Sequence, residues 1–449
     1  MLRHIERYDH KNSEFDTIQC NVAGLISPEG ASVVTSDEGY VNRILAQPIS
    51  FDKFMALRGN VKHVGVTQEF KEIVEFFDTP AGETPAGFRI EYTLDADMVL
   101  RVNLIRDISY DRNGLKRPTN ILFSADSANP YEVESIKSII ANLTCNPQLV
   151  YDWFLNDPKV NIGNAFKTRE EVMTEIGRVL GPGADISVEL NNPFADDSAI
   201  LEEAAQFKEI LSKYRVVIKV PHTGAVNGEN IKELLEGDKK FKRRYNEGTT
   251  ADFLRGHNIA IMLKEHGYRV NFTLMMEPHQ VALALQARPY FINTFYKFRL
   301  FQNRVFKELL TSYESTGNAD YLKRLRDFMF EKDYITPDET GLDLMEIKKQ
   351  AEYFVNYRNF DNHEGEDGLD QARHALRSMR QSNLPDTRLI ICSMEAELYS
   401  LLDKMLMEEE FRDMTHRVVI TTAPNYLASN VCAPGMIHYH REFMRAAGN

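Results

Sequence analysis

Apolar and polar positions alternate in blocks from about residue 120 to near the end of the chain. Short apolar runs are followed by amphipathic stretches of helical length, a pattern typical of parallel α/β folds. The expected strands are Asn120–Asp126, Asn142–Thr144, Ile186–Glu189, Val216–Val220, Val270–Leu274, Tyr290–Phe295, Leu389–Ser393 and Val418–Thr421. Eight such units predict an α/β fold, a (β/α)8 TIM barrel. An open doubly wound sheet is the alternative, but no GxGxxG turn follows the first strand to support it.

Helical patterns occupy the segments between these runs. The expected helices include Tyr131–Ala141, Ser198–Lys213, Asn258–His266, Pro278–Ala287, Gly368–Arg380 and Ala396–Glu408. With right-handed crossovers, these helices would surround the barrel.

Three segments do not belong to a minimal barrel. Residues 1–118 precede a barrel over 119–449, and the alternation at Phe88–Arg106 predicts a hairpin in a small α+β domain of unknown role. An insertion at about 225–256 carries the basic run Lys239–Arg244, which we interpret as a solvated helix face. A second insertion at about 300–366 predicts about three charged helices. Both follow the C-terminal ends of strands, where TIM-barrel sites lie, so both could cover a site.

Composition narrows the class of protein. The 449 residues are 43% hydrophobic and 27% charged, near the averages of globular proteins. Lys plus Arg is 53 and Asp plus Glu is 66, and the net charge of −13 disfavours nucleic acid and anionic membranes as partners. The four cysteines form no CxxC pair, and no signal peptide or long apolar span is visible. We therefore expect a cytoplasmic protein without a structural zinc site.

Three ionisable residues stand at the ends of expected strands. Lys219 interrupts the apolar strand Val216–Val220, and a buried lysine amine with a lowered pKa can form a Schiff base with a carbonyl. Asp126 and Glu189 end two other strands. Each residue alone could be a snorkelling lysine or a helix cap, but together they suit carbon–carbon bond chemistry with a nucleophile and acid/base groups.

The motifs around these residues resemble the transaldolase family. Ser124-Ala125-Asp126-Ser127-Ala128-Asn129-Pro130 is similar to the family's DTAN-type first strand, and Thr144-Cys145-Asn146-Pro147-Gln148-Leu149 is similar to its TTNPSL turn. Later matches, in order, are Ile186-Ser187-Val188-Glu189, Val217-Ile218-Lys219-Val220-Pro221, Val270-Asn271-Phe272-Thr273-Leu274, Asp367-Gly368 and Thr422-Ala423-Pro424. The resemblance spans about residues 120–430.

The resemblance implies an enzyme that needs neither metal nor organic cofactor. Lys219 would attack the C2 carbonyl of a ketose, and Asp126 would take the C4 hydroxyl proton as the C3–C4 bond breaks. Glu189 and Thr273 would hold the water that shuttles protons. The implied substrate-binding residues are Thr144, Asn146, Asn271, Asn293, Phe295, Lys297 and Arg299.

The implied activity is transfer of a dihydroxyacetone unit from a ketose to an aldehyde. The partner would be a sugar or sugar phosphate of carbohydrate metabolism, in the pentose phosphate pathway. Relatives that only cleave fructose phosphate tend to have tyrosine where this chain has Phe295, which favours transfer.

Two departures concern the phosphate of the substrate. The family holds it with arginines after the sixth and seventh strands, where this chain has Phe298 and Glu395. Asn293 also replaces the serine of the family's SPF sequence. Two explanations remain open: an unphosphorylated or otherwise atypical substrate, or a phosphate site rebuilt from Lys297, Arg299 and the run 239–244.

Alternative functions are an aldolase for an atypical sugar and a non-catalytic barrel that serves as a binding module. A homo-oligomeric contact through residues 1–118 is a hypothesis drawn from their position alone. His438 and His440 alternate as on a strand, but two lone histidines do not make a metal site. His222 follows the Lys219 strand and could contact substrate, whereas Trp153 and Met275-Met276 are expected in the core.

Overall fold

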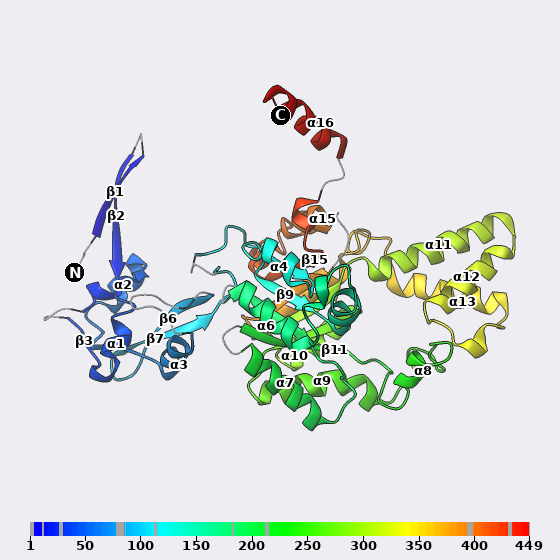
Figure 1. Cartoon of the computed structure of the whole chain (residues 1–449), viewed down its shortest axis with the longest axis horizontal. Coiled ribbons are helices and arrows are strands. Elements are labelled where there is room, and N and C mark those ends of the chain that lie inside the picture. The colour runs from blue at the N-terminus through cyan, green and yellow to red at the C-terminus, as the bar shows by residue number, and fades with distance from the viewer. Residues whose placement is uncertain are drawn as a thin grey trace. The chain divides into compact units, whose positions relative to one another are not determined.

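The computed structural model describes residues 4–10, 13–26, 30–77, 85, 87–111, 115–181, 184–211, 215–392, 398–429 and 433–448. Figure 1 presents the chain, which divides into two compact units. One consists of Met1–Thr119 with Leu180–Asp185 and Lys213–Arg215, and the other contains the rest of the chain.

The larger unit is built on a closed barrel. Its strands are β8 (Leu122–Asp126), β9 (Asn142–Cys145), β10 (Asp185–Glu189), β11 (Arg215–Pro221), β12 (Val270–Met275), β13 (Phe291–Phe295), β14 (Arg388–Cys392) and β15 (Val418–Thr422). They follow one another in chain order, and β15 pairs with β8 in parallel, Thr421 opposite Ser124, to close the ring. The predicted (β/α)8 barrel is confirmed, and closure excludes the open sheet.

Helices surround this barrel (Figure 1). They are α4 (Pro130–Ile136), α5 (Pro147–Val150), α6 (Arg169–Leu180), α7 (Asp197–Ile210), α9 (Thr250–Glu265), α10 (Pro278–Gln286), α14 (Asp370–Arg380) and α15 (Leu398–Leu406). The outward positions of the strands are apolar because they pack under these helices, as Ile218, Phe272 and Ile292 do while almost fully buried. Every second position points into the barrel, and this alternation brings polar side chains inside.

The smaller unit has two sheets. The first has the order β1 (His4–His10), β2 (Ser13–Asn21) and β4 (Pro48–Ile49), and the second the order β3 (Ser32–Val33), β5 (His63–Val66), β7 (Val99–Arg106) and β6 (Phe88–Leu94). The hairpin expected at Phe88–Arg106 is present as antiparallel β6 and β7. Helices α1 (Glu38–Val41), α2 (Phe51–Leu57) and α3 (Gln68–Phe76) complete an α+β unit around a core that includes Phe54, Phe70 and Leu100.

The second insertion forms a helical subdomain of the larger unit. Helices α11 (Phe298–Thr316), α12 (Asp320–Glu331) and α13 (Leu344–Arg358) lie side by side in Figure 1. They enclose their own apolar core, in which Phe306 stacks on Phe354 with ring centroids 5.8 Å apart. The three helices expected in this region are therefore present.

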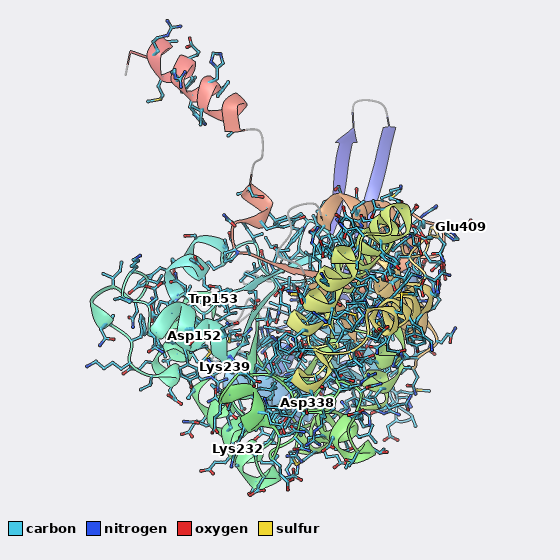
Figure 2. All side chains as sticks on the ribbon, turned by 90° about the vertical axis from the view of Figure 1, so that its right-hand side faces the viewer. Asp152, Trp153, Lys232, Lys239, Asp338 and Glu409 are labelled. Atoms are coloured by element: carbon cyan, nitrogen blue, oxygen red, sulfur yellow. The ribbon has the colours of Figure 1, made fainter. Side chains whose placement is uncertain are left out.

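The first insertion differs from expectation. The basic run 239–244 lies in an irregular segment between α8 (Ile231–Leu235) and α9, not on a helix face. Gly237 and Lys239 have positive φ angles of 60° and 56°, which end helical geometry at the start of the run. Acidic side chains neutralise the run, since Lys240 Nζ lies 2.8 Å from a carboxylate oxygen of Asp333. Figure 2 labels Lys232 and Lys239, which belong to this insertion, and Asp338.

Two further expectations were wrong. Trp153 is not in the core, because 56% of its surface is exposed, and Figure 2 shows it beside Asp152 at the surface. His438 and His440 lie on helix α16 (Ala433–Ala446), not on a strand. Met275 is fully buried, as expected, whereas Met276 is only partly buried.

Candidate functional site

A cavity of about 290 Å³ opens at the C-terminal ends of the barrel strands. It lies where the inward-pointing ends of most of the strands meet. Its lining residues are Asp126, Thr144, Asn146, Pro147, Gln148, Glu189, Lys219, Thr273, Leu274, Asn293, Phe295 and Cys392. The barrel thus gathers residues that are far apart in the sequence around one space.

Lys219 lies in this cavity and is 6% exposed. Its Nζ is 2.9 Å from Glu189 Oε2, across the neighbouring strands β10 and β11. Burial lowers the pKa of Lys219, but the negative charges of Glu189 and Asp126 outweigh it, so the net pKa lies above its usual value. The expected fall in pKa is therefore wrong, because two strand-end carboxylates face the same ammonium.

Asp126 lies at the end of β8 in the same cavity. Burial raises its pKa, Lys219 lowers it and Glu189 raises it, and the net pKa lies above that of an ordinary aspartate. A carboxyl group with a raised pKa is a stronger base when ionised and a usable acid when protonated. The site therefore combines a lysine amine with a carboxyl group suited to proton transfer.

Several polar atoms in the barrel interior have no protein partner. Among the described residues, buried side-chain atoms without a hydrogen-bond partner include Asp126 Oδ1, Thr144 Oγ1, Asn271 Oδ1 and Nδ2, Thr273 Oγ1 and Asn293 Oδ1. Most belong to residues that line the cavity. Because buried polar groups are normally satisfied, these atoms are available to hydrogen-bond water or a polar ligand in the cavity.

One buried asparagine links three strands just below the cavity. Asn142 Nδ2 donates to Ser124 Oγ at 2.8 Å, and Ser187 Oγ donates to Asn142 Oδ1 at 2.9 Å. Ser124 lies two residues before Asp126, and Ser187 lies two residues before Glu189. Side chains two apart on a strand share a face. The network therefore fixes the spacing of the strands that carry both acids.

The end of β12 is irregular at the cavity. The pairing of β12 with β13 shifts register between Phe272 and Met275, and Leu274 has a φ of 64°. A positive φ at leucine is strained, and such strain gathers at functional sites. This bulge is where Thr273 and Leu274 join the cavity lining.

The structure brings together most of the residues expected at the site. Those in the lining are Lys219, Asp126, Glu189, Thr273, Thr144, Asn146, Asn293 and Phe295. Asn271 is fully buried and is the register partner of Lys219 on β12, but it does not line the cavity. Lys297 and Arg299 do not line the cavity, and Glu395 lies outside the described residues.

The two expected phosphate ligands have other surroundings. Arg299 is paired with Glu277 at 3.1 Å and also with Asp370. Lys297 is 5% exposed, and its Nζ lies 4.9 Å from the centroid of the Tyr296 ring. Both residues follow β13 in the chain. Arg299 pairs with Glu277 just before α10 and with Asp370 in α14, whereas Lys297 packs against aromatic rings. The spacing of residues in the sequence could not show these partners.

Gln148, Leu274 and Cys392 line the cavity without having been expected as site residues. Gln148 follows Asn146-Pro147 and lies in α5, and that motif was the available signal for it. Cys392 ends β14, and burial raises the pKa of its thiol to about 12, so this thiol stays protonated. Nothing in the residue types of these three positions distinguishes them from structural residues.

Other features of the described chain carry less chemistry. His222 does not line the cavity, and burial lowers its pKa. Within the described ranges, no cluster of three or more histidine, cysteine, aspartate and glutamate side chains could hold a metal ion. None of the described helices is both long and apolar enough to cross a membrane.

Comparisons with known proteins indicate a family for part of the barrel. The family model of Transaldolase/Fructose-6-phosphate aldolase matches residues 123–328, which include β8 to β13. No curated protein sequence matches the chain. A crystal structure of an HpcH/HpaI aldolase/citrate lyase family protein from Burkholderia cenocepacia J2315 is similar at 8% identity over 74% of this chain and 97% of that one. Its TM-score of 0.28 is too low to carry an argument. Residues 123–328 of the barrel are therefore similar to the transaldolase/fructose-6-phosphate aldolase family, and aldolase-type chemistry is the class of function that this similarity indicates.

Proposed function

We propose that this protein is a transaldolase-like enzyme that transfers a dihydroxyacetone unit from a ketose to an aldehyde through a Schiff base on Lys219. The observation that carries the proposal is the buried Lys219–Glu189 contact of 2.9 Å in a cavity that also holds Asp126. A lysine amine, a proton acceptor in contact with it and a second acid are the parts that imine chemistry requires.

Imine formation would begin with proton transfer from Lys219 to Glu189. The neutral amine would attack the C2 carbonyl of the ketose, and the resulting carbinolamine would lose water to give an iminium ion. Glu189 supports this step because its carboxylate already contacts the ammonium and can take its proton and later return it. Thr273 Oγ1, which has no protein partner among the described residues, could hold the departing water.

Bond cleavage would follow at Asp126. This carboxylate would take the proton of the C4 hydroxyl as the C3–C4 bond breaks, and the electron pair of that bond would move into the iminium group to form an enamine. The aldehyde fragment would leave. The enamine would then attack an acceptor aldehyde, and hydrolysis of the new imine would release the product and free Lys219. The raised pKa of Asp126 suits it to accept and return this proton.

The remaining cavity residues would bind the three-carbon unit. Thr144, Asn146 and Asn293 place hydroxyl and amide groups in the lining, and Asn271 lies beside Lys219 in register. Phe295 lines the cavity with an apolar ring and offers no hydroxyl to activate water. Without a hydroxyl at Phe295 to activate water, transfer to an acceptor aldehyde is favoured over release by water. The phenylalanine therefore supports the transaldolase over the aldolase alternative.

The proposal is tested by reductive trapping. The protein is incubated with dihydroxyacetone and borohydride, and the adduct is located by intact mass and peptide mapping. We expect one reduced adduct on Lys219, and none in the Lys219→Met protein, whose fold is checked by circular dichroism. A folded wild-type protein that gives no adduct on Lys219 beside a working control enzyme would overturn the proposal.

A further inference from the structure

The cavity contains one cation and two acids. Among the described residues that line it, Lys219 is the single lysine or arginine, and Glu189 and Asp126 are the acids. The other lining residues carry no charge at neutral pH, since Cys392 stays protonated. Because Glu189 already compensates the Lys219 ammonium at 2.9 Å, the described lining residues offer no free positive charge to a ligand.

Neighbouring cations are held elsewhere. Arg299 is 7% exposed, is paired with Glu277 and Asp370, and lines a different cavity of about 490 Å³. Lys297 packs its ammonium near the rings of Tyr296 and Phe301, 4.9 Å and 5.7 Å from their centroids. Neither side chain belongs to the lining of the Lys219 cavity.

Arg169 is a further cation near Glu189, but it contacts the backbone of Glu189 and not its carboxylate. It donates to the backbone carbonyl of Glu189, and its Nη1 is 2.6 Å from Glu203. Residues 393–397, which follow Cys392 in the chain, lie outside the described residues, but their sequence SMEAE contains two glutamates and no lysine or arginine. The chain segment directly after β14 therefore supplies no cation either.

We propose that this site takes a ketose whose tail is an uncharged polyol and discriminates against sugar phosphates. The inference rests on the proposed function and names its substrate class. A phosphate dianion in this cavity would face Asp126 and Glu189 at low dielectric without a compensating cation, which is unfavourable. Hydroxyl groups would instead find partners in the unsatisfied oxygens of Thr144 and Asn293, and in the Gln148 amide at the opening.

The test compares erythrulose with erythrulose 4-phosphate as trapping substrates. Neither ketotetrose can close a five-membered ring, so both present an open ketone. They differ in the charge of the tail and in the C4 hydroxyl, which the phosphate esterifies and which imine trapping does not need. We expect the concentration that gives half-maximal trapping on Lys219 to be at least about tenfold higher for the phosphate. Equal or stronger trapping of the phosphate would overturn the inference.

Dihydroxyacetone serves as the control that separates failure of the substrate inference from failure of the proposed function. It has no tail, so its trapping depends only on the imine chemistry. An adduct on Lys219 with dihydroxyacetone shows that the imine chemistry works, and the two erythruloses then decide the substrate class. Absence of an adduct with all three ketoses overturns the proposed function, and the inference falls with it.

Gln148 offers a matched pair of variants, because its exposed side chain stands at the opening of the cavity. In Gln148→Lys the preference should shift toward the phosphate by about tenfold, and in Gln148→Glu it should shift further toward the neutral sugar. Lys297→Met tests the competing phosphate ligand directly. A selective loss of phosphate trapping in that protein would show that Lys297 binds the phosphate, and would contradict the inference.

Discussion

At the scale of single residues, the charge state of Lys219 is set by its neighbours more than by its burial. A lysine buried among aliphatic side chains would lose its proton readily. Here the carboxylates of Glu189 and Asp126 stabilise the ammonium, and the net pKa is raised. The resting site therefore holds a protonated lysine beside the group that can accept its proton.

Replacement of Glu189 tests this balance. In Glu189→Gln the negative charge that contacts Lys219 is lost. The effect of burial, which lowers the pKa of Lys219, is then opposed less, and this pKa falls. Since only the neutral amine attacks a carbonyl, the rise of the trapping rate with pH should begin at lower pH than in the wild type. The measurement is the rate of dihydroxyacetone trapping from pH 5 to pH 10, a range of about five units around neutrality.

Glu203→Gln is the control, because Glu203 pairs with Arg169 and not with Lys219. Its trapping rate should follow the wild-type curve over the same pH range. A Glu189→Gln profile that stays unchanged, or moves to higher pH, would show that Glu189 does not hold the pKa of Lys219 up.

At the scale of elements, the network of Asn142 joins β8, β9 and β10 below the acids. Both functional groups of its side chain are satisfied by serine hydroxyls, and Asn142 is fully buried. Three strands that could slide relative to one another are thereby held in one register. The acids lie one inward position above this network, so their separation depends on it.

Asn142→Leu should weaken both stability and chemistry. Leucine has a similar size but leaves the hydroxyls of Ser124 and Ser187 without their partner, which costs about 2 kcal/mol of unfolding free energy. We expect the maximal trapping rate to fall more than the half-saturating ketose concentration rises, because the acids move while the binding groups remain. Urea unfolding followed by circular dichroism and trapping kinetics measure the two effects.

Ser124→Ala removes one bond of the network and should show a smaller loss of both quantities. An Asn142→Leu protein that is destabilised but traps at the wild-type maximal rate would assign Asn142 a purely structural role.

At the scale of the whole molecule, the single tryptophan reports almost nothing about the core. Trp153 is 56% exposed in the native chain. Its fluorescence emission should therefore already lie near that of a solvated indole, and unfolding in urea should shift the emission maximum only slightly. Quenching by acrylamide should be strong before and after unfolding, whereas a large red shift on unfolding would place Trp153 in a buried environment.

The barrel was predictable from sequence because its signal is local. Alternation between strand and helix periods places each element, and Lys219 is conspicuous as a charge in an apolar strand. The strand ends that carry Asp126 and Glu189 also follow from this pattern. Parallel strands then bring their C-terminal ends together, so the grouping of these three residues around one cavity follows from the fold.

Other properties depend on partners that sequence does not pair. The pKa of Lys219 depends on distances across strands, and Arg299 is held by Asp370, 71 positions along the chain. The basic run 239–244 leaves helical geometry at a positive-φ turn and meets acids about 90 positions away, as Lys240 meets Asp333. Such pairings arise from tertiary packing, and neither periodicity nor motif spacing encodes them.

Closure of the barrel by β15 has a consequence for the order in which the chain is made. The strand that ends in Asp126 has β9 on one side and β15 on the other, and β15 ends at Thr422. During synthesis β8 leaves the ribosome about 300 residues before its second neighbour, and until then one edge of the growing sheet is open to other strands. A nascent or truncated chain that lacks β15 would thus carry Lys219 and both acids without a closed ring to hold them. Such chains should depend on chaperones and should be inert, so Lys219 acquires its complete surroundings only after β15 has been synthesised.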